Sequence, residues 1–110
     1  MPCSRTTPQE FTIDDLRRIR RLVATRIIDN GERLAIHEIC LNAVTHGGGT
    51  GWLAFCGRNQ TCQVWDHGQG IRRNPAPQVE SGRGLLIARS LATVVVASGP
   101  CGTLVTIAPG

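Results

Sequence analysis

The segment from Glu32 to Thr45 constrains the fold of this chain more than any other part of its sequence. Apolar residues recur along it at helical spacing and form one broad face, while leucines flank the polar residues Glu38 and Asn42 on the other. A run of three glycines begins at Gly47, where the backbone is free to leave the helical conformation. We therefore expect a helix over 32–45 that other parts of the molecule cover on most sides.

Glu38 and Asn42 are four residues apart in this helix. Their side chains therefore project from the same face, one turn from each other. Burial of a carboxylate beside an amide costs free energy unless each finds a hydrogen-bond partner. The pair predicts a ligand, a metal ion or a local hydrogen-bond network at this face.

A second amphipathic helix is expected over 14–28. Its apolar residues recur at helical spacing, and arginines occupy the other side. Thr12 and Asp15 resemble a capping box at its start. Asn30-Gly31 supplies a left-handed residue that ends the helix.

The rest of the chain alternates between short strands and turns, with Trp52 and Trp65 expected in the core. Strands are predicted over 52–56, 62–66, 93–97 and 103–107, and a third helix over 84–92. This order predicts an α+β fold, a two-layer sandwich of helices on a mostly antiparallel (mixed) sheet. Residues 1–11 contain two prolines and no periodic pattern, so we expect a tail or edge strand before one domain over 12–110.

The chain has a net charge of +4, and all 12 of its cationic residues are arginines. A P-loop needs the lysine of its motif and a Schiff-base enzyme needs an amine, so the lack of lysine excludes both. This net positive charge is compatible with nucleic-acid binding. However, the arginines between 17 and 21 fit the solvated face of one helix. We therefore expect no nucleic-acid partner and keep a basic nucleic-acid-binding domain as an alternative.

The five cysteines are odd in number and include no C-x-x-C pair. A disulfide framework or zinc site would favour even numbers or tight spacing, so we expect reduced, mostly buried thiols in a cytoplasmic protein. No signal-peptide pattern opens the sequence, and no apolar run approaches membrane-spanning length. We expect a soluble protein with no membrane partner.

Two glycine motifs have chemical meaning. Asp66 ends a predicted strand and is followed by Gly68 and Gly70, so its carboxylate is placed to accept a hydrogen bond from an exocyclic amine such as that of adenine. The alternative is an aspartate-capped glycine turn. The turn Gly82-Arg83-Gly84 opens the third predicted helix, where free N–H groups form a natural phosphate site. The alternative there is a loop with a solvated arginine.

Taken together, these segments resemble a known family. HEICLNAVTHG at 37–47 precedes VWDHGQG at 64–70, GRGL at 82–85 and Gly102-Thr103. In order and content they resemble the N, G1 and G2 boxes of the GHKL, or histidine-kinase-like, ATPase superfamily. The chain looks most like its anti-sigma-factor serine-kinase branch, over about residues 12–108.

The resemblance implies bound ATP and Mg²⁺. In that family pattern Asn42 matches the Mg²⁺ ligand and Glu38 the acid that activates the attacking hydroxyl or water. His46 matches the histidine that ends the N box, where it either caps the helix or approaches phosphate. The remaining matches are Asp66 to the adenine-reading aspartate, Gly68 and Gly70 to the pocket floor, Gly82, Arg83 and Gly84 to the phosphate turn, and Thr103 to the adenine and water network.

The resemblance further implies an ATP-dependent serine/threonine kinase in bacterial transcription control. Such a kinase acts by partner switching between a sigma factor and an anti-anti-sigma protein, and it can form a homodimer. The alternative is a non-catalytic nucleotide-binding output module of a signalling system.

Overall fold

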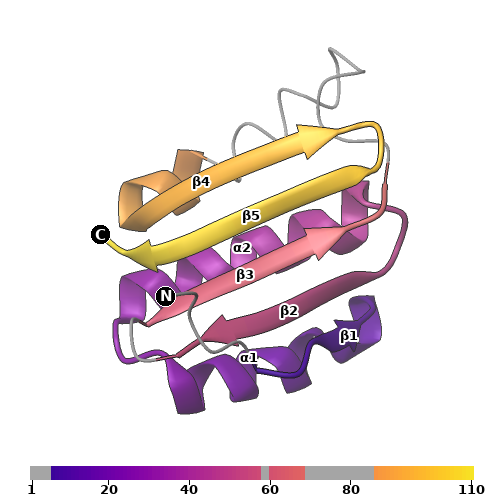
Figure 1. Ribbon diagram of the computed structural model, residues 1–110. Coiled ribbons are helices and arrows are strands. Elements are labelled where there is room, and N and C mark those ends of the chain that lie inside the picture. The colour runs from indigo at the N-terminus through magenta and orange to yellow at the C-terminus, as the bar shows by residue number, and fades with distance from the viewer. Residues whose placement is uncertain (1–5, 58–59, 69–85) are drawn as a thin grey trace.

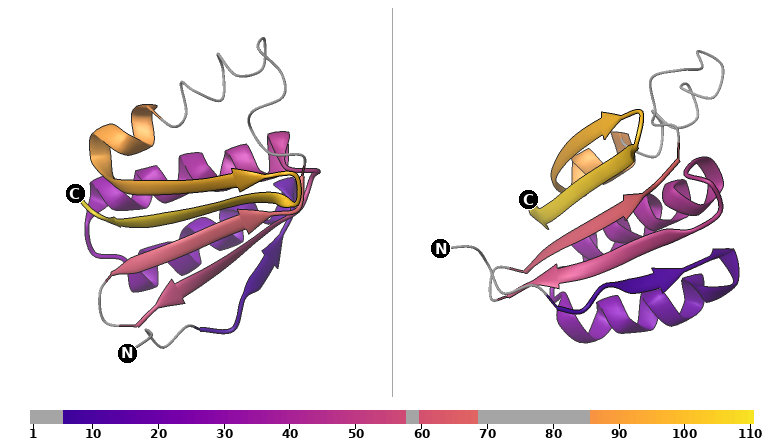
Figure 2. Two further views of the ribbon diagram at one scale, coloured as in Figure 1. Left: turned by 45° about the horizontal axis from the view of Figure 1, so that its top comes forward. Right: turned by 45° about the vertical axis from the view of Figure 1, so that its right-hand side comes forward.

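A sheet of five strands forms one layer of the molecule, and helices cover one of its faces (Figures 1 and 2). The computed structural model describes residues 6–57, 60–68 and 86–110. The strands are β1 (Gln9–Phe11), β2 (Gly51–Cys56), β3 (Thr61–Asp66), β4 (Ala92–Gly99) and β5 (Gly102–Pro109). Their order is β1-β2-β3-β5-β4, and every pairing is antiparallel. The α+β fold is confirmed.

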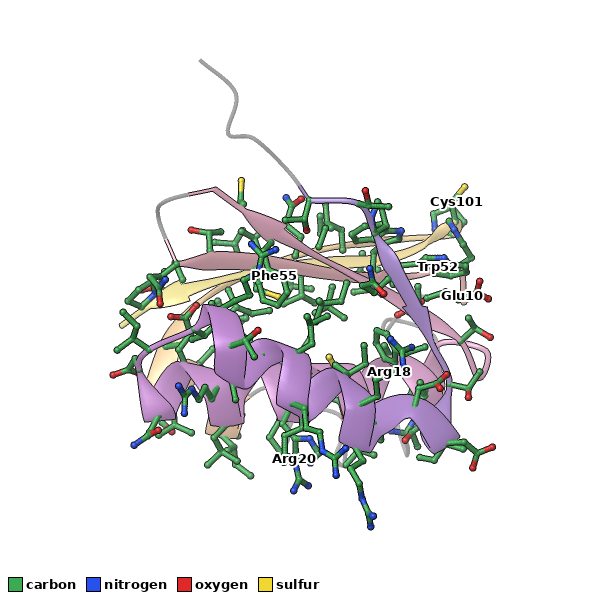
Figure 3. The ribbon with its side chains drawn as sticks, turned by 90° about the horizontal axis from the view of Figure 1, so that it is seen from below. Glu10, Arg18, Arg20, Trp52, Phe55 and Cys101 are labelled. Carbon is green, nitrogen blue, oxygen red and sulfur yellow. The ribbon has the colours of Figure 1, made fainter. Side chains whose placement is uncertain are left out.

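The helical layer consists of η1 (Ile13–Asp15), α1 (Leu16–Arg26) and α2 (Asn30–His46). Residues 86–91 are also helical, inside the third helix expected over 84–92. The two long helices run in opposite directions under the sheet (Figures 1 and 3). They pack against each other and α2 lies under β3 and β5, so α2 is the central helix of this layer.

The predicted junction between the first two helices is wrong. Helix α1 ends at Arg26, because Ile27 is already extended. The pair Asn30-Gly31 forms the first turn of α2 instead of ending α1, and Gly31 has no positive φ. The carboxylate of Asp29 accepts a hydrogen bond from the Glu32 backbone N–H at 2.7 Å and caps α2.

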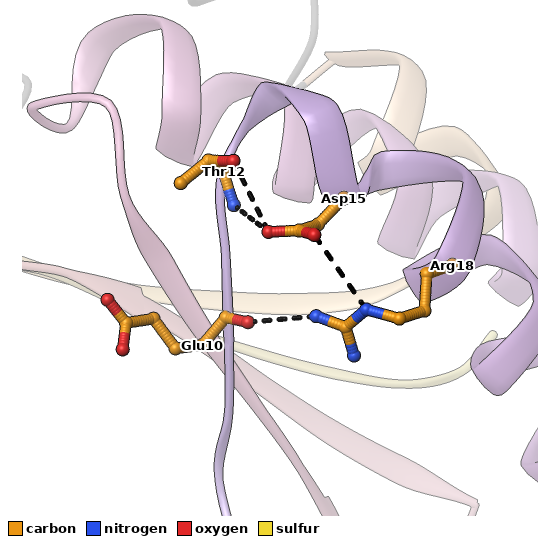
Figure 4. Close-up of polar contacts among 4 residues, drawn as sticks. All are labelled: Glu10, Thr12, Asp15 and Arg18. Carbon is orange, nitrogen blue, oxygen red and sulfur yellow. Dashed lines mark hydrogen bonds and ion pairs between the residues drawn. The ribbon is translucent and has the colours of Figure 1, made fainter.

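The predicted capping box at Thr12 and Asp15 is confirmed (Figure 4). The Asp15 carboxylate accepts hydrogen bonds from the backbone N–H and the hydroxyl of Thr12, at 2.9 and 3.2 Å. These bonds, the backbone one above all, lower the pKa of Asp15. Arg18 lies 3.8 Å from the same carboxylate and donates to the Glu10 carbonyl, which ties α1 to β1.

The core lies between the sheet and the two long helices. Alternate residues of each strand face it, as in β5, where Thr103, Val105 and Ile107 are buried. Trp52 and Trp65 pair across β2 and β3, but both remain partly exposed and neither belongs to the core cluster. The expectation that both tryptophans lie in the core is therefore wrong: they occupy the strand positions that alternate with the core-facing ones.

One acidic residue is enclosed in this core. Glu32 is fully buried, and neither carboxylate oxygen has a hydrogen-bond partner within the part of the chain that the structure describes. Burial first, and then the nearby Asp29 carboxylate, raise the pKa of Glu32 to about 7. Glu32 therefore gives up its proton only near neutral pH.

The cysteines depart from the expectation of five reduced thiols. Cys40 and Cys62 are free and buried and Cys101 is free and exposed, but Cys56 is disulfide-bonded. Burial raises the pKa of the Cys40 thiol, which is unreactive as a result. Over the described ranges, none of the helices is both long enough and apolar enough to cross a membrane.

Candidate nucleotide site

The C-terminal ends of α2 and β3 meet at the same end of the sheet (Figure 1). Gly47 follows the last helical residue and is buried there, and its N–H donates to the Ala43 carbonyl. A Cβ atom on Gly47 would lie 2.6 Å from Oδ2 of Asp66, too close for any real contact. The glycine that ends the helix therefore lets the backbone lie directly against the aspartate.

Asp66 is held by the loop that follows it. Its Oδ1 accepts a hydrogen bond from the Gly68 N–H at 2.9 Å. Gly68 in turn packs on Gly47, since a Cβ on Gly68 would lie 2.7 Å from the Gly47 Cα. Two glycines from separate segments thus pack against one carboxylate.

The charge of Asp66 is set by opposing effects. Partial burial raises its pKa, while hydrogen bonds from the backbones of Gly68 and Thr103, and the adjacent His67, act in the opposite direction. Oδ1 accepts a hydrogen bond from the Gly68 N–H, and the Thr103 backbone also donates to the carboxylate, whose two oxygens can together accept more than two hydrogen bonds. The carboxylate can therefore accept a further hydrogen bond from a ligand amine.

Thr103, on β5, lies beside Asp66. It pairs with Asp66 across the two strands, and its side chain is 7% exposed. Its hydroxyl lies 3.2 Å from the Ser98 hydroxyl on β4, so the two share a hydrogen bond. Gly102 allows this close approach, because any Cβ there would overlap the Asp66 backbone. Ser98 was missed in the sequence, since only the β4–β5 register brings it to Thr103.

The other predicted residues of α2 lie upstream of Gly47. Glu38 and Asn42 are half-buried and His46 is exposed. Asn42 precedes Gly47 by about 7.5 Å along the helix axis. Hydrogen bonds to Glu38 or Asn42 are absent within the described part of the chain, but partial exposure leaves their oxygens open to solvent. Of the possibilities considered for this pair, a local hydrogen-bond network is thus not formed. The side-chain oxygens of Glu38 and Asn42 are free to bind a ligand.

Several predicted residues cannot be placed. Gly70 and the turn Gly82-Arg83-Gly84 lie outside the described residues. His67 is described, and its ring meets that of Trp52 edge to face at 4.8 Å, which fixes the residue next to Asp66. The structure therefore brings together Gly47, Asp66, Gly68 and Thr103, with Glu38, Asn42 and His46 on the adjoining helix.

A family model, the histidine kinase-like ATPase domain, matches residues 12–108. The chain belongs to this family. No curated protein matches the chain. The match begins at Thr12 of the capping box and ends within β5, and it supports an ATP-binding module of the histidine kinase-like type. The anti-sigma-factor branch is a finer division that this match does not address.

Members of the histidine kinase-like ATPase family generally bind ATP with Mg²⁺, and the residues of this chain fit both. Mg²⁺ prefers oxygen ligands and usually combines one or two protein oxygens with substrate phosphates and water. Asn42 and Glu38 offer such oxygens from one helix face. No cluster of three or more acidic, histidine or cysteine side chains within the described ranges could hold a metal alone. The ion would therefore depend on phosphate oxygens of the nucleotide.

Proposed function

We propose that this protein is an ATP-binding regulatory domain that acts as an anti-sigma-factor serine/threonine kinase. The observation that carries the proposal is the enclosure of the Asp66 carboxylate by Gly47 and Gly68, beside the helix that presents Glu38 and Asn42. A carboxylate at the end of a strand, packed against two glycines, suits an adenine amine. The order of these segments in the sequence supports the same assignment.

In the proposed reaction the phosphoryl group passes from ATP to a serine or threonine hydroxyl of an anti-anti-sigma protein. Glu38 accepts the hydroxyl proton, and Asn42 would hold Mg²⁺, which neutralises phosphate charge when bound. Phosphoryl transfer mostly requires positioning and charge stabilisation. The half-exposed location of Glu38 supports this role, since a protein substrate must reach it. A cytoplasmic location, a sigma factor as the second partner, and a homodimer belong to the same proposal.

Transfer of labelled phosphate from Mg-ATP to the cognate anti-anti-sigma protein tests the kinase activity. Glu38→Gln should abolish transfer while leaving ATP binding intact, because it keeps the shape of the side chain and removes the base. His37→Gln is the matched control, since His37 precedes Glu38 directly in sequence but is rotated about 100° from it around α2 and faces the α1 side. ATP binding without transfer by the wild-type chain would reject the kinase and favour a non-catalytic nucleotide-binding module.

A further inference from the structure

A second recess lies between α1 and α2, with a volume of about 400 Å³. Its walls are mainly apolar side chains of both helices: Leu16, Ile19, Val23, Leu34, Ile36 and Cys40. It is open to solvent, because Leu34 on its wall is 47% exposed. We call it the α1–α2 groove. Ile19, Val23, Ile36 and Cys40 form its buried floor, and Leu34 and the partly buried Leu16 give it an accessible apolar rim.

The α1–α2 groove is separate from the candidate nucleotide site. Leu34 and His37 line it, whereas Glu38 and Asn42 do not. Successive helical residues are rotated by about 100°, so Asn42 lies about 140° around α2 from His37. The two sites occupy different sides of the same helix.

Positive charge surrounds the groove. Helix α1 carries five arginines and no acidic residue. Arg20 lines the groove and points away from the sheet (Figure 3), and it has no ion pair within the part of the chain described. Arg33 also lines the groove, where the Ala24 and Ile27 carbonyls accept hydrogen bonds from its guanidinium, and none of the described carboxylates forms an ion pair with it. Two cations without an ion-pair partner among the described residues therefore flank the apolar floor.

We propose that the α1–α2 groove docks an acidic amphipathic helix of a partner protein. Apolar side chains of that helix would enter the groove and its carboxylates would meet Arg20 and Arg33, as in other helix-in-groove complexes. A second copy of this chain is disfavoured, because its net charge is +4 and α1 is its own basic helix. Nucleic acid would engage the arginines but leave Leu34 and the apolar floor uncovered. This inference stands independently of the proposed kinase activity.

Fluorescence anisotropy with the full chain tests the groove. The probe is a labelled helical peptide of about 18 residues, or five turns, with leucines at i, i+3, i+4 and i+7 spacing and glutamates elsewhere. A peptide of the same composition with scattered leucines, and a labelled DNA duplex, are the comparison probes. Arg20→Glu and Leu34→Ser alter the groove. Arg89→Glu and Ile28→Ser make the same changes at exposed residues outside it.

The amphipathic peptide should bind more tightly than the scattered one, and Arg20→Glu should weaken it about tenfold. Leu34→Ser should also weaken it, while Arg89→Glu and Ile28→Ser should leave it within about twofold of wild type. Equal binding of both peptides, equal effects of Arg20→Glu and Arg89→Glu, or binding of the DNA alone would each overturn the proposal. Thermal unfolding checks that each variant folds, and Arg20→Gln replaces any Arg20→Glu protein that does not.

Discussion

The backbone of Gly47 lies directly against the carboxylate of Asp66. A Cβ at position 47 would lie 2.6 Å from Oδ2, although the φ of −104° at Gly47 is one that any residue adopts. The requirement for glycine here is therefore steric, and it comes from the Asp66 side chain together with the Ala43 carbonyl oxygen, which lies closer still to the same Cβ position than Oδ2 does. This contact joins the end of α2 to the end of β3, which carries Asp66.

Gly47→Ala should displace the Asp66 carboxylate and weaken ATP binding by more than about tenfold, the cost of one hydrogen bond to a charged group. Calorimetric titration with ATP measures the effect. Gly48→Ala is the matched control, because among the described residues, its two chain neighbours apart, no atom lies within 4 Å of the added methyl group. Its φ of +92° costs about 1 kcal/mol of folding stability but leaves Asp66 in place. Equal ATP affinities for the two variants would contradict the steric argument.

Thr103→Val should lower the affinity for ATP about fivefold, the equivalent of one neutral hydrogen bond. Valine keeps the shape of the side chain but removes the hydroxyl that shares a hydrogen bond with Ser98, on the residue that pairs with Asp66. Thr106→Val, on the same strand, removes a hydroxyl 3.5 Å from Gln63, at a position that alternates with the core-facing residues. The same titration should find wild-type affinity for Thr106→Val. A similar loss in both variants would indicate a general effect on β5.

Most of the architecture could be predicted because strand alternation and helical spacing are local signals. The hairpin strands and the polar face of α2 needed no tertiary information. The first helix ended too late in the prediction because Asp29, and not Asn30-Gly31, marks the junction. Trp52 and Trp65 were misplaced because a large apolar residue in a strand is compatible with either face. Gly47 had a visible signal in its glycine run, but its contact with Asp66 depends on packing between distant segments.

Glu32 should make folding stability depend on pH. Its pKa rises from an ordinary value of 4.5 to about 7 in the folded chain, so between these values the folded protein holds a proton that the unfolded chain has lost. Stability therefore falls as pH rises through this window, by about 3 kcal/mol, and levels off above it. Denaturant unfolding of wild type and Glu32→Gln at pH values from 4.5 to 8 isolates this contribution.

Glutamine at position 32 has the same shape and does not titrate. The difference in unfolding free energy between Glu32→Gln and wild type should therefore grow with pH in favour of the variant. A difference that stays constant across the window would show that the Glu32 carboxyl titrates at its ordinary pKa. Asp29→Asn should shift the window to lower pH, because it removes the second cause of the raised pKa.

The central claim is that Asp66 reads the base of a nucleotide, and calorimetric titration with ATP, with and without Mg²⁺, tests it most directly. Wild type should bind ATP, and Asp66→Asn should bind at least about tenfold more weakly, because the amide presents a donor in place of a carboxylate oxygen. Thermal unfolding checks that the variant folds. Wild-type ATP affinity in a folded Asp66→Asn protein would contradict the account.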